Sequence, residues 1–288
     1  MVVDPGSFLA RAPIAQLQSP AAHPEWMRRR LLVVPTLVVL NLVVFLLWGM
    51  AVNNRPLLVL LRDNFVVSTS HLVSGRPWTL LTAAFSHQEL WHLAVNMLVL
   101  YSFGGVLERL LGRRVFTTFY LVTAIVSSAS HCAVSTLLLG RSDLGALGAS
   151  GAVSGLLLAY SLLFPKHRIL LFWVIPVPAL VGALLFVGLD IWGLVAQSAG
   201  GGLPIGHGAH LGGAACGGLF YLTYLRQRIR RFASARPPGG AVLEVTEEEA
   251  TELDRLRAKV EREGPQALTV DEQAFLRAIR QRFADQGR

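Results

Sequence analysis

Charged residues are scarce in this sequence. Only 15% of the 288 residues are Asp, Glu, Lys or Arg, whereas 53% are hydrophobic. A soluble domain usually carries about 25% charged residues, which cover its surface. Several apolar runs reach the roughly 20 residues that a helix needs to cross a bilayer. The composition therefore excludes an ordinary soluble protein and predicts a multi-span helical membrane protein.

Cysteine is scarce as well. Cys132 and Cys216 both fall inside apolar runs and do not have CxxC spacing. This pattern excludes a disulfide framework and a cysteine metal site, and it indicates small packing residues. Residues 1–27 contain no continuous apolar core. We therefore expect no cleavable signal peptide, and we expect the first span to act as the targeting signal.

Acidic residues are outnumbered, and the net charge is +8. The basic residues are grouped at the ends of apolar runs, which is typical of membrane orientation signals rather than of nucleic-acid binding. The clusters are Arg28–Arg30, Arg113–Arg114, Lys166 with Arg168, and Arg226–Arg231. Their alternation predicts that all four share the cytoplasmic face. We therefore expect both termini to be cytoplasmic, and we expect no nucleic-acid partner.

The organisation along the chain follows from these runs. We expect a cytoplasmic segment at 1–30, a six-span membrane domain at 31–230, a linker at 231–245 and a cytoplasmic helical tail at 246–288. The spans are expected at about 31–52, 90–111, 115–139, 147–164, 169–196 and 209–225. The fold class is thus an all-α polytopic bundle with a small helical tail.

Three local features refine this layout. Pro176 and Pro178 should bend the fifth span or delay its start. The outer loop at about 53–89 is long and apolar, so part of it should lie at the membrane interface. In the tail, Thr246 and Thr269 precede helical patterns as capping residues do.

Four polar residues are expected at one depth in the membrane. Ser150 lies near the outer end of the fourth span, His210 near that of the sixth, and His92 and Asn96 near that of the second. With a rise of about 1.5 Å per residue, all four should lie within roughly 10 Å of the outer boundary. Polar groups inside a membrane are costly and usually functional.

Small residues should bring these polar groups together. The segment "GASGAVSG", residues 148–155, puts glycines beside Ser150, and glycines recur around His210 at helical spacing. Small faces allow close helix approach in lipid. An imidazole within hydrogen-bond reach can activate a serine hydroxyl as a nucleophile. The backbone N–H of Ser150, with His92 and Asn96, could then stabilise the oxyanion.

The same segments resemble the rhomboid family of intramembrane serine proteases. The motifs are "GASG" (148–151), "AHLGG" (209–213), "HQELWHLAVN" (87–96), "GGVLERLLG" (104–112) and "IPVPA" (175–179). The last motif and the C-terminal tail are similar to segments of bacterial members, so we expect a bacterial-type protein in the bacterial inner membrane. The resemblance covers residues 31–230 and the tail.

The resemblance implies a Ser–His dyad that cleaves transmembrane helices of other proteins within the lipid bilayer. By that resemblance Ser150 is the nucleophile, His210 is the general base, and His92 and Asn96 form the oxyanion site. The supporting residues are His87, Gly148 and Gly151. No cofactor and no metal are implied, and the oligomeric state is left open.

Two positions depart from the family pattern. Ser154 stands where the family often has an aromatic residue packed on the catalytic histidine, so the orientation of His210 should depend on another residue. Thr79 follows Trp78 where the family usually has a Trp-Arg pair, so the anchoring of the outer loop should differ.

Two intramembrane carboxylates need separate interpretations. Asp190, in the fifth span, could complete a triad with His210, but we expect an interfacial or interhelical hydrogen bond because the family uses no acid there. Glu108, near the inner end of the second span, is expected to be structural and bonded to loop backbone.

Three other functions are compatible with parts of the pattern. One is an inactive or weakly active rhomboid-like protein that binds membrane clients, although the intact Ser150–His210 pair argues against it. A second is a metal enzyme that uses the histidines at positions 87, 92, 207 and 210, but HExxH is absent. The third is a transporter, for which neither an inverted repeat nor paired midplane charges are found.

Overall fold

The computed structural model describes residues 30–171, 174–202, 205–227 and 246–285. Two compact units make up the chain, Met1–Leu225 and Arg226–Arg288. Residues 1–29 of the expected N-terminal segment and all of the expected linker at 231–245 lie outside the described residues.

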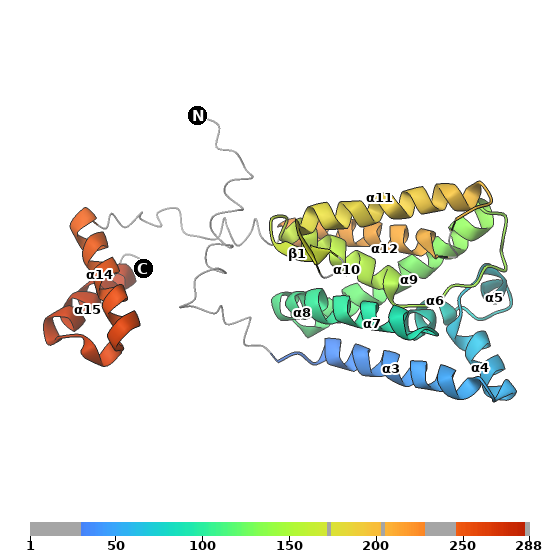
Figure 1. The fold of residues 1–288 in the computed structure, drawn as a ribbon, viewed down its shortest axis with the longest axis horizontal. Coiled ribbons are helices and arrows are strands. Elements are labelled where there is room, and N and C mark those ends of the chain that lie inside the picture. The colour runs from blue at the N-terminus through green and yellow to red at the C-terminus, as the bar shows by residue number, and fades with distance from the viewer. Residues whose placement is uncertain (1–29, 172–173, 203–204, 228–245, 286–288) are drawn as a thin grey trace. The chain divides into compact units, whose positions relative to one another are not determined.

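The first unit is mainly a bundle of helices (Figure 1). Its described elements are α3 (Val33–Ala51), α4 (Arg55–Phe65), α5 (Thr69–Val73), α6 (Thr79–Thr82), the 3₁₀ turn η2 (Ala83–Phe85), α7 (Leu90–Val99), the π-helical turn η3 (Leu100–Gly104), α8 (Gly105–Leu111), α9 (Arg113–Leu137), α10 (Ser150–Leu163), β1 (Arg168–Leu171), β2 (Ile175–Pro178), α11 (Ala179–Ser198), α12 (His207–Phe220) and the π-helical turn η4 (Tyr221–Leu225).

Four helical stretches in the described part of the chain are long and apolar enough to cross a membrane. They are Val33–Ala51, Leu90–Leu111, Arg113–Leu137 and Ala179–Ser198. The apolar helix α10 has only 14 residues. The two short elements α12 and η4 follow one another without a break. The predicted count of six spans therefore stays a prediction.

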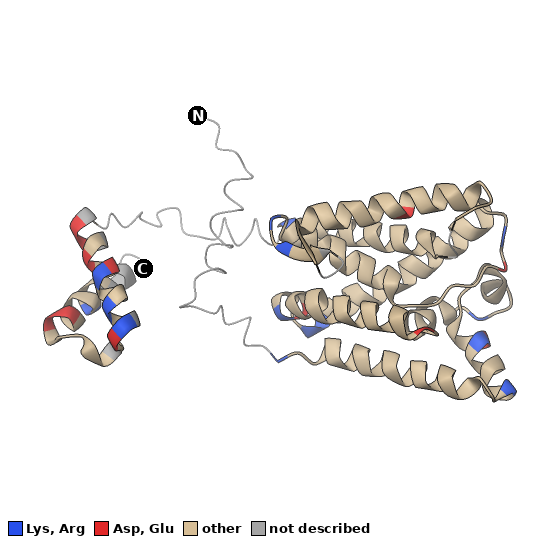
Figure 2. Ribbon diagram, in the orientation of Figure 1, with Lys and Arg blue, Asp and Glu red and all other residues tan. Residues whose placement is uncertain are grey.

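The surface of the bundle is largely apolar. Val39 and Leu46 of α3 are 56% and 63% exposed, and Trp192 of α11 is 71% exposed. Figure 2 shows that Lys and Arg lie at the end of the bundle that holds β1 and the α8–α9 junction, on α4 and in loops at the opposite end, while the helices between are almost uncharged. Such outward-facing apolar side chains are typical of helices that contact lipid.

The interior of the bundle is closely packed. The fully buried side chains of Phe116 and Tyr120 on α9 meet those of Leu100, Leu107 and Leu156 from the neighbouring elements. This core holds α7, α8, α9 and α10 in a fixed arrangement.

The helix of the fifth predicted span starts later than Ile169, which is the delay expected as one of two effects of Pro176 and Pro178. Ile169 pairs with Val177 in the antiparallel sheet β1–β2, and α11 begins only at Ala179. Proline has no backbone N–H and disrupts a helix interior, so Pro176 and Pro178 delay the helix until after the hairpin. The two-stranded sheet itself was not predicted.

Glu108 has the structural role expected of it. Its carboxylate accepts hydrogen bonds from the backbone N–H groups of Leu32, Val33 and Val34 at 2.8–3.0 Å. A carboxylate at a helix N-terminus satisfies donors that lack intrahelical acceptors. Glu108 therefore joins the second span to the start of α3.

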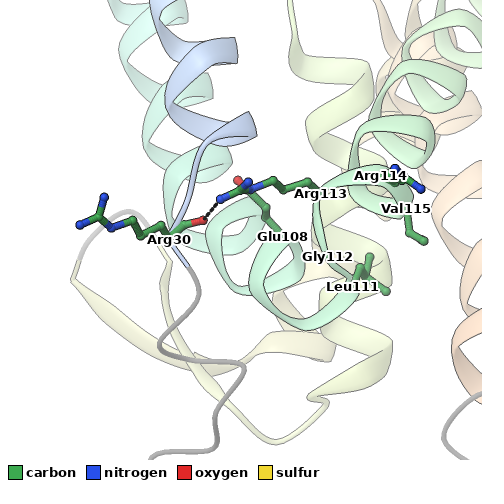
Figure 3. A pocket seen from close by; sticks show the side chains of 7 residues that line it. All are labelled: Arg30, Glu108, Leu111, Gly112, Arg113, Arg114 and Val115. Atoms are coloured by element: carbon green, nitrogen blue, oxygen red, sulfur yellow. Dashed lines mark hydrogen bonds between the residues drawn. The ribbon is translucent and has the colours of Figure 1, made fainter.

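A pocket of about 450 Å³ lies beside this junction. Its lining residues, drawn in Figure 3, are Arg30, Glu108, Leu111, Gly112, Arg113, Arg114 and Val115. The side chains of Arg30 and Arg114 lie on opposite sides of the view, and Arg113 turns toward the backbone carbonyl of Arg30. The guanidinium groups therefore do not converge on one point.

The loop expected on the outer side, at about 53–89, is anchored by polar contacts. The indole N–H of Trp78 donates to the side-chain oxygen of Asn64 at 3.0 Å, and Arg76 pairs with Asp63 at 3.2 Å. Thr79 is fully buried, and its hydroxyl donates to the backbone carbonyl of Arg76. The anchoring of this loop thus involves Thr79 directly.

The second unit contains α14 (Glu247–Glu263), the 3₁₀ turn η5 (Pro265–Ala267) and α15 (Val270–Asp285). Thr246 and Glu249 form a capping box at the start of α14. Thr269 and Glu272 exchange the same two hydrogen bonds at the start of α15. Both helices therefore begin at the threonines that the sequence indicated.

Candidate active site

Ser150 is placed by the sharp turn that begins α10. Gly148 has a φ of +125°, which disfavours any residue with a Cβ atom. A Cβ added there would also lie 2.6 Å from Cε1 of His92. Ser150 follows as the first residue of α10, so its N–H is among those without an intrahelical acceptor. The glycine thus lets the His92 ring approach the backbone beside the serine.

His210 meets Ser150 because α10 and α12 touch backbone to backbone. A Cβ on Gly213 would lie 1.9 Å from the carbonyl oxygen of Gly151, and one on Gly217 would lie 2.1 Å from that of Gly155. At this approach Nε2 of His210 lies 2.8 Å from Oγ of Ser150. The predicted combination of glycine packing and a serine–imidazole contact is therefore present in the structure.

The other nitrogen of His210 bonds to a carboxylate. Nδ1 of His210 lies 2.9 Å from Oδ1 of Asp190. An ionised carboxylate only accepts, so Nδ1 carries the proton and Nε2 is left as the acceptor for the Ser150 hydroxyl. This tautomer is the one that a general base needs.

Asp190 has a second imidazole partner. Nδ1 of His207 lies 2.7 Å from the same oxygen, Oδ1. The side chains of Asp190 and His207 are 13% and 8% exposed, whereas that of His210 is 20% exposed. The contacts from α11 to α12 confirm the interhelical hydrogen bond expected for Asp190.

Two more predicted residues, His87 and His92, lie beside the turn that carries Ser150, and a third, Asn96, bonds to His92. The rings of His87 and His92 are 4.8 Å apart, centroid to centroid, with an edge-on geometry. The Asn96 amide donates to the carbonyl of His92 at 2.8 Å, which uses one of its two N–H bonds. Nε2 of His87 accepts from the N–H of Ala149 at 3.3 Å. His87 thus supports the turn that carries Ser150.

Burial fixes the charge state of His87. Desolvation, with a smaller contribution from His92, lowers the pKa of His87 to about 3. The imidazole is therefore neutral near pH 7, as its role as an acceptor from Ala149 requires.

Gly151, the remaining predicted site residue, serves packing, and Ser154 bonds within its own helix. Gly151 faces Ser127 of α9, since a Cβ there would lie 1.7 Å from the Ser127 hydroxyl oxygen. Ser154 donates its hydroxyl to the backbone carbonyl of Ser150 at 2.8 Å. The departure at Ser154 thus leaves Asp190 as the residue that bonds to the far side of the His210 ring.

The sequence did not lead us to expect that Asp190 and His207 belong to the hydrogen-bond network of His210. A single carboxylate in the middle of an apolar helix was the signal for Asp190, and the three-residue spacing from His210 was the signal for His207. Both were visible, but their meeting depends on the rotation of α11 against α12, which the sequence does not specify.

The structure also bears on the metal alternative. Within the described ranges, the side chains whose ligand atoms lie within 4.8 Å of one another are Asp190, His207 and His210. The four histidines considered from the sequence do not form such a group there. The short contacts within this trio are those of N–H donors to one carboxylate oxygen.

Comparison with known proteins gives consistent matches. Residues 74–228 match the Rhomboid domain family. Similar proteins include RHOMBOID-like protein 12, mitochondrial, of Arabidopsis thaliana, which is 32% identical over 210 residues, 69% of this chain and 60% of that protein. Rhomboid protein 1, mitochondrial, of Saccharomyces cerevisiae is 38% identical over 210 residues, 68% of this chain and 55% of that protein.

A human relative has a similar match. Presenilin-associated rhomboid-like protein, mitochondrial, of Homo sapiens is 30% identical over 190 residues, 65% of this chain and 47% of that protein. The chain thus spans about half to three fifths of the length of these relatives. All three are mitochondrial, so the expectations of a bacterial-type member and of the bacterial inner membrane are not borne out.

Proposed function

This chain belongs to the rhomboid family, and from that premise we propose that it is an intramembrane serine endopeptidase. It is an integral, multi-pass membrane protein, and rhomboid proteases act on membrane proteins within the bilayer. The proposed substrates are therefore transmembrane segments of other proteins, cleaved near the outer leaflet. One observation carries the proposal, the 2.8 Å contact between Oγ of Ser150 and Nε2 of His210.

The contact supports a two-step acyl transfer. Oγ of Ser150 attacks the scissile carbonyl carbon while Nε2 of His210 takes the hydroxyl proton. The tetrahedral intermediate then breaks its C–N bond, and His210 gives the proton to the leaving amine. A water molecule, deprotonated by His210, then attacks the acyl-enzyme. The bond between the acyl carbon and Oγ breaks, His210 returns the proton to Oγ of Ser150, and the carboxylic acid leaves.

The oxyanion needs donors that are already in place. The N–H of Ser150 at the start of α10, the ring of His92 and the remaining N–H of the Asn96 amide are the proposed donors. The close contact of Gly148 with the His92 ring positions that imidazole beside the reacting serine.

We extend the proposal to membrane topology. Together with the four long spans, α10 and the α12–η4 pair would cross as two short spans inside the bundle, giving six. The arginine clusters would then share one side with both termini, and Ser150 would open to the other. Substrate helices must unwind locally there, because a regular helix holds its carbonyls in hydrogen bonds.

Reconstitution with a model transmembrane substrate tests the proposal. Ser150→Ala should lower cleavage by at least about 10³-fold, because no other group supplies the nucleophile. Ser161→Ala is the matched control on the same helix, since its buried hydroxyl has no hydrogen-bond partner among the described residues. Unchanged cleavage in Ser150→Ala would refute the protease. A parent protein that binds the substrate without cleaving it would favour the client-binding alternative.

A further inference from the structure

The hydrogen bonds of the site continue beyond Ser150 and His210. Oδ1 of Asp190 lies 2.9 Å from Nδ1 of His210 and 2.7 Å from Nδ1 of His207. Resting on the proposed function, we propose that Asp190 is a positioning residue that orients His210 and stabilises its protonated form, and that His207 holds Asp190 in place. The site would then operate as a serine–histidine–aspartate array rather than as a dyad.

The bond fixes both the tautomer and the ring angle of His210. With Nδ1 donating to Asp190, Nε2 has the lone pair that faces the Ser150 hydroxyl. When Nε2 takes the serine proton, the imidazolium keeps its Nδ1–H bond to the carboxylate, and the opposite charges attract across a short distance. The proton later leaves from Nε2 to the amine, so Asp190 stays ionised throughout.

The placement of Asp190 is costly unless it is paired. Its neighbours Leu189 and Ile191 are 56% and 52% exposed on the outer surface of α11, whereas Asp190 as a whole residue is 9% exposed and turns into the bundle. A buried carboxylate requires compensating donors, and here both are imidazole N–H groups. A single histidine would suffice to join α11 to α12, but the carboxylate also engages the ring that contacts Ser150.

The fold makes room for the second histidine. A Cβ added to Gly193, one turn after Asp190, would lie 2.3 Å from Cε1 and Nε2 of His207. The glycine therefore lets the His207 ring lie against the backbone of α11 while its Nδ1 reaches the carboxylate. The rings of His207 and His210 are nearly perpendicular at 86°, with centroids 6.4 Å apart.

Other ionisable groups around His210 come from different helices. His92 approaches from α7, and His131 of α9 lies near the start of α12, where its Nε2 is 3.0 Å from the carbonyl oxygen of Leu144. Among the described residues, Asp190 is the carboxylate within hydrogen-bond reach of His210. Its removal therefore takes away the anionic partner of the imidazolium.

The test compares Asp190→Asn with the parent in reconstituted cleavage. The kcat should fall by at least about 10-fold, while KM stays within about twofold, since the side chain does not contact substrate. The matched control is Asp63→Asn, which removes a carboxylate paired with Arg76 in the outer loop. A purely structural Asp190 would lower the melting temperature and leave the kcat of the folded fraction unchanged, which would overturn the inference.

Two further readings keep the outcome decisive. Ser150→Ala separates the two hypotheses. If Ser150→Ala is inactive and Asp190→Asn is fully active, the array is rejected and the protease is kept. If Ser150→Ala is active, both are rejected. If Asp190→Asn does not fold, the ¹⁵N chemical shifts of His210 in the parent decide. A protonated Nδ1 with an unprotonated Nε2 supports the array, and the opposite tautomer overturns it.

Discussion

At the scale of single residues, the site depends on what the smallest side chains permit. The glycines around Ser150 and His210, together with the common depth expected for these two residues, predicted their contact, because small faces let two helices approach closely in lipid. The link from His210 to Asp190 was raised as an alternative but not favoured, because one carboxylate in an apolar helix does not reveal which neighbouring helix it faces.

Gly148→Ala should inactivate the site. The substitution combines a φ of +125° with a Cβ only 2.6 Å from the His92 ring, so both His92 and the turn before Ser150 must move. The free energy of unfolding should fall by about 1–3 kcal/mol, and fluorophosphonate labelling of Ser150 should be lost. Gly75→Ala is the control, because its φ of +80° gives similar strain while a Cβ there meets no atom within 4 Å. Parent-like labelling of Gly148→Ala would show that the contact with His92 is unimportant.

At the scale of helices, close packing of α10 on α12 sets the distance between the reacting atoms. The predicted faces of small residues on these two helices were confirmed, because glycine repeats at helical spacing are visible in a sequence. The hairpin at Arg168–Pro178 was missed, since a short apolar run before a helix has no periodicity that separates strand from helix.

Gly213→Ala should separate α10 from α12. The added Cβ would lie 1.9 Å from the backbone oxygen of Gly151, which cannot rotate away as a side chain does. Overpacking of this kind costs about 1–3 kcal/mol, and a shift of about 1 Å in the site can cost ~10²-fold in rate. Gly218→Ala, on the same helix, would meet Leu158 at an ordinary 3.6 Å and should remain active. Equal cleavage rates for the two variants would argue against this packing as the determinant of the site.

The helices of the second unit are joined by one carboxylate. Glu272 of α15 accepts from Lys259 and Arg255 of α14 and from the N–H of Thr269. Lys259 and the Thr269 backbone are the largest causes that lower the pKa of Glu272 to about 2. The stabilisation is therefore complete above the ordinary carboxyl pKa of 4.5 and is lost as the pH falls from there through about 2.

Hydrogen exchange in the full chain measures how much the bonds of Glu272 stabilise α14 and α15. Glu272→Gln should increase exchange in both α14 and α15 at neutral pH, whereas Asp271→Asn, an exposed neighbour, should not. In the parent, exchange corrected for intrinsic rates should rise as the pH is lowered from 4.5 toward 2. Unchanged protection in Glu272→Gln would mean that apolar packing alone holds the two helices together.

At the scale of the whole molecule, composition predicted the class and local chemistry predicted the site. Scarce charge and long apolar runs indicated a membrane bundle, and four helices fulfil that expectation by length and composition. The helix α11 starts late, as one of the two expected effects of Pro176 and Pro178, because both prolines lie in β2 and the helix begins directly after Pro178. The membrane in which the chain resides was not predictable from its own residues, since orientation signals report sidedness rather than location.

The central claim is that Ser150 is a nucleophile activated by His210, and covalent labelling tests it most directly. The reconstituted protein is treated with a fluorophosphonate and the modified peptide is identified by mass spectrometry. The account predicts an adduct on Ser150 in the parent, its absence in Ser150→Ala, and a strong loss in His210→Gln. Labelling at another serine, or labelling of Ser150 that is independent of His210, would contradict it.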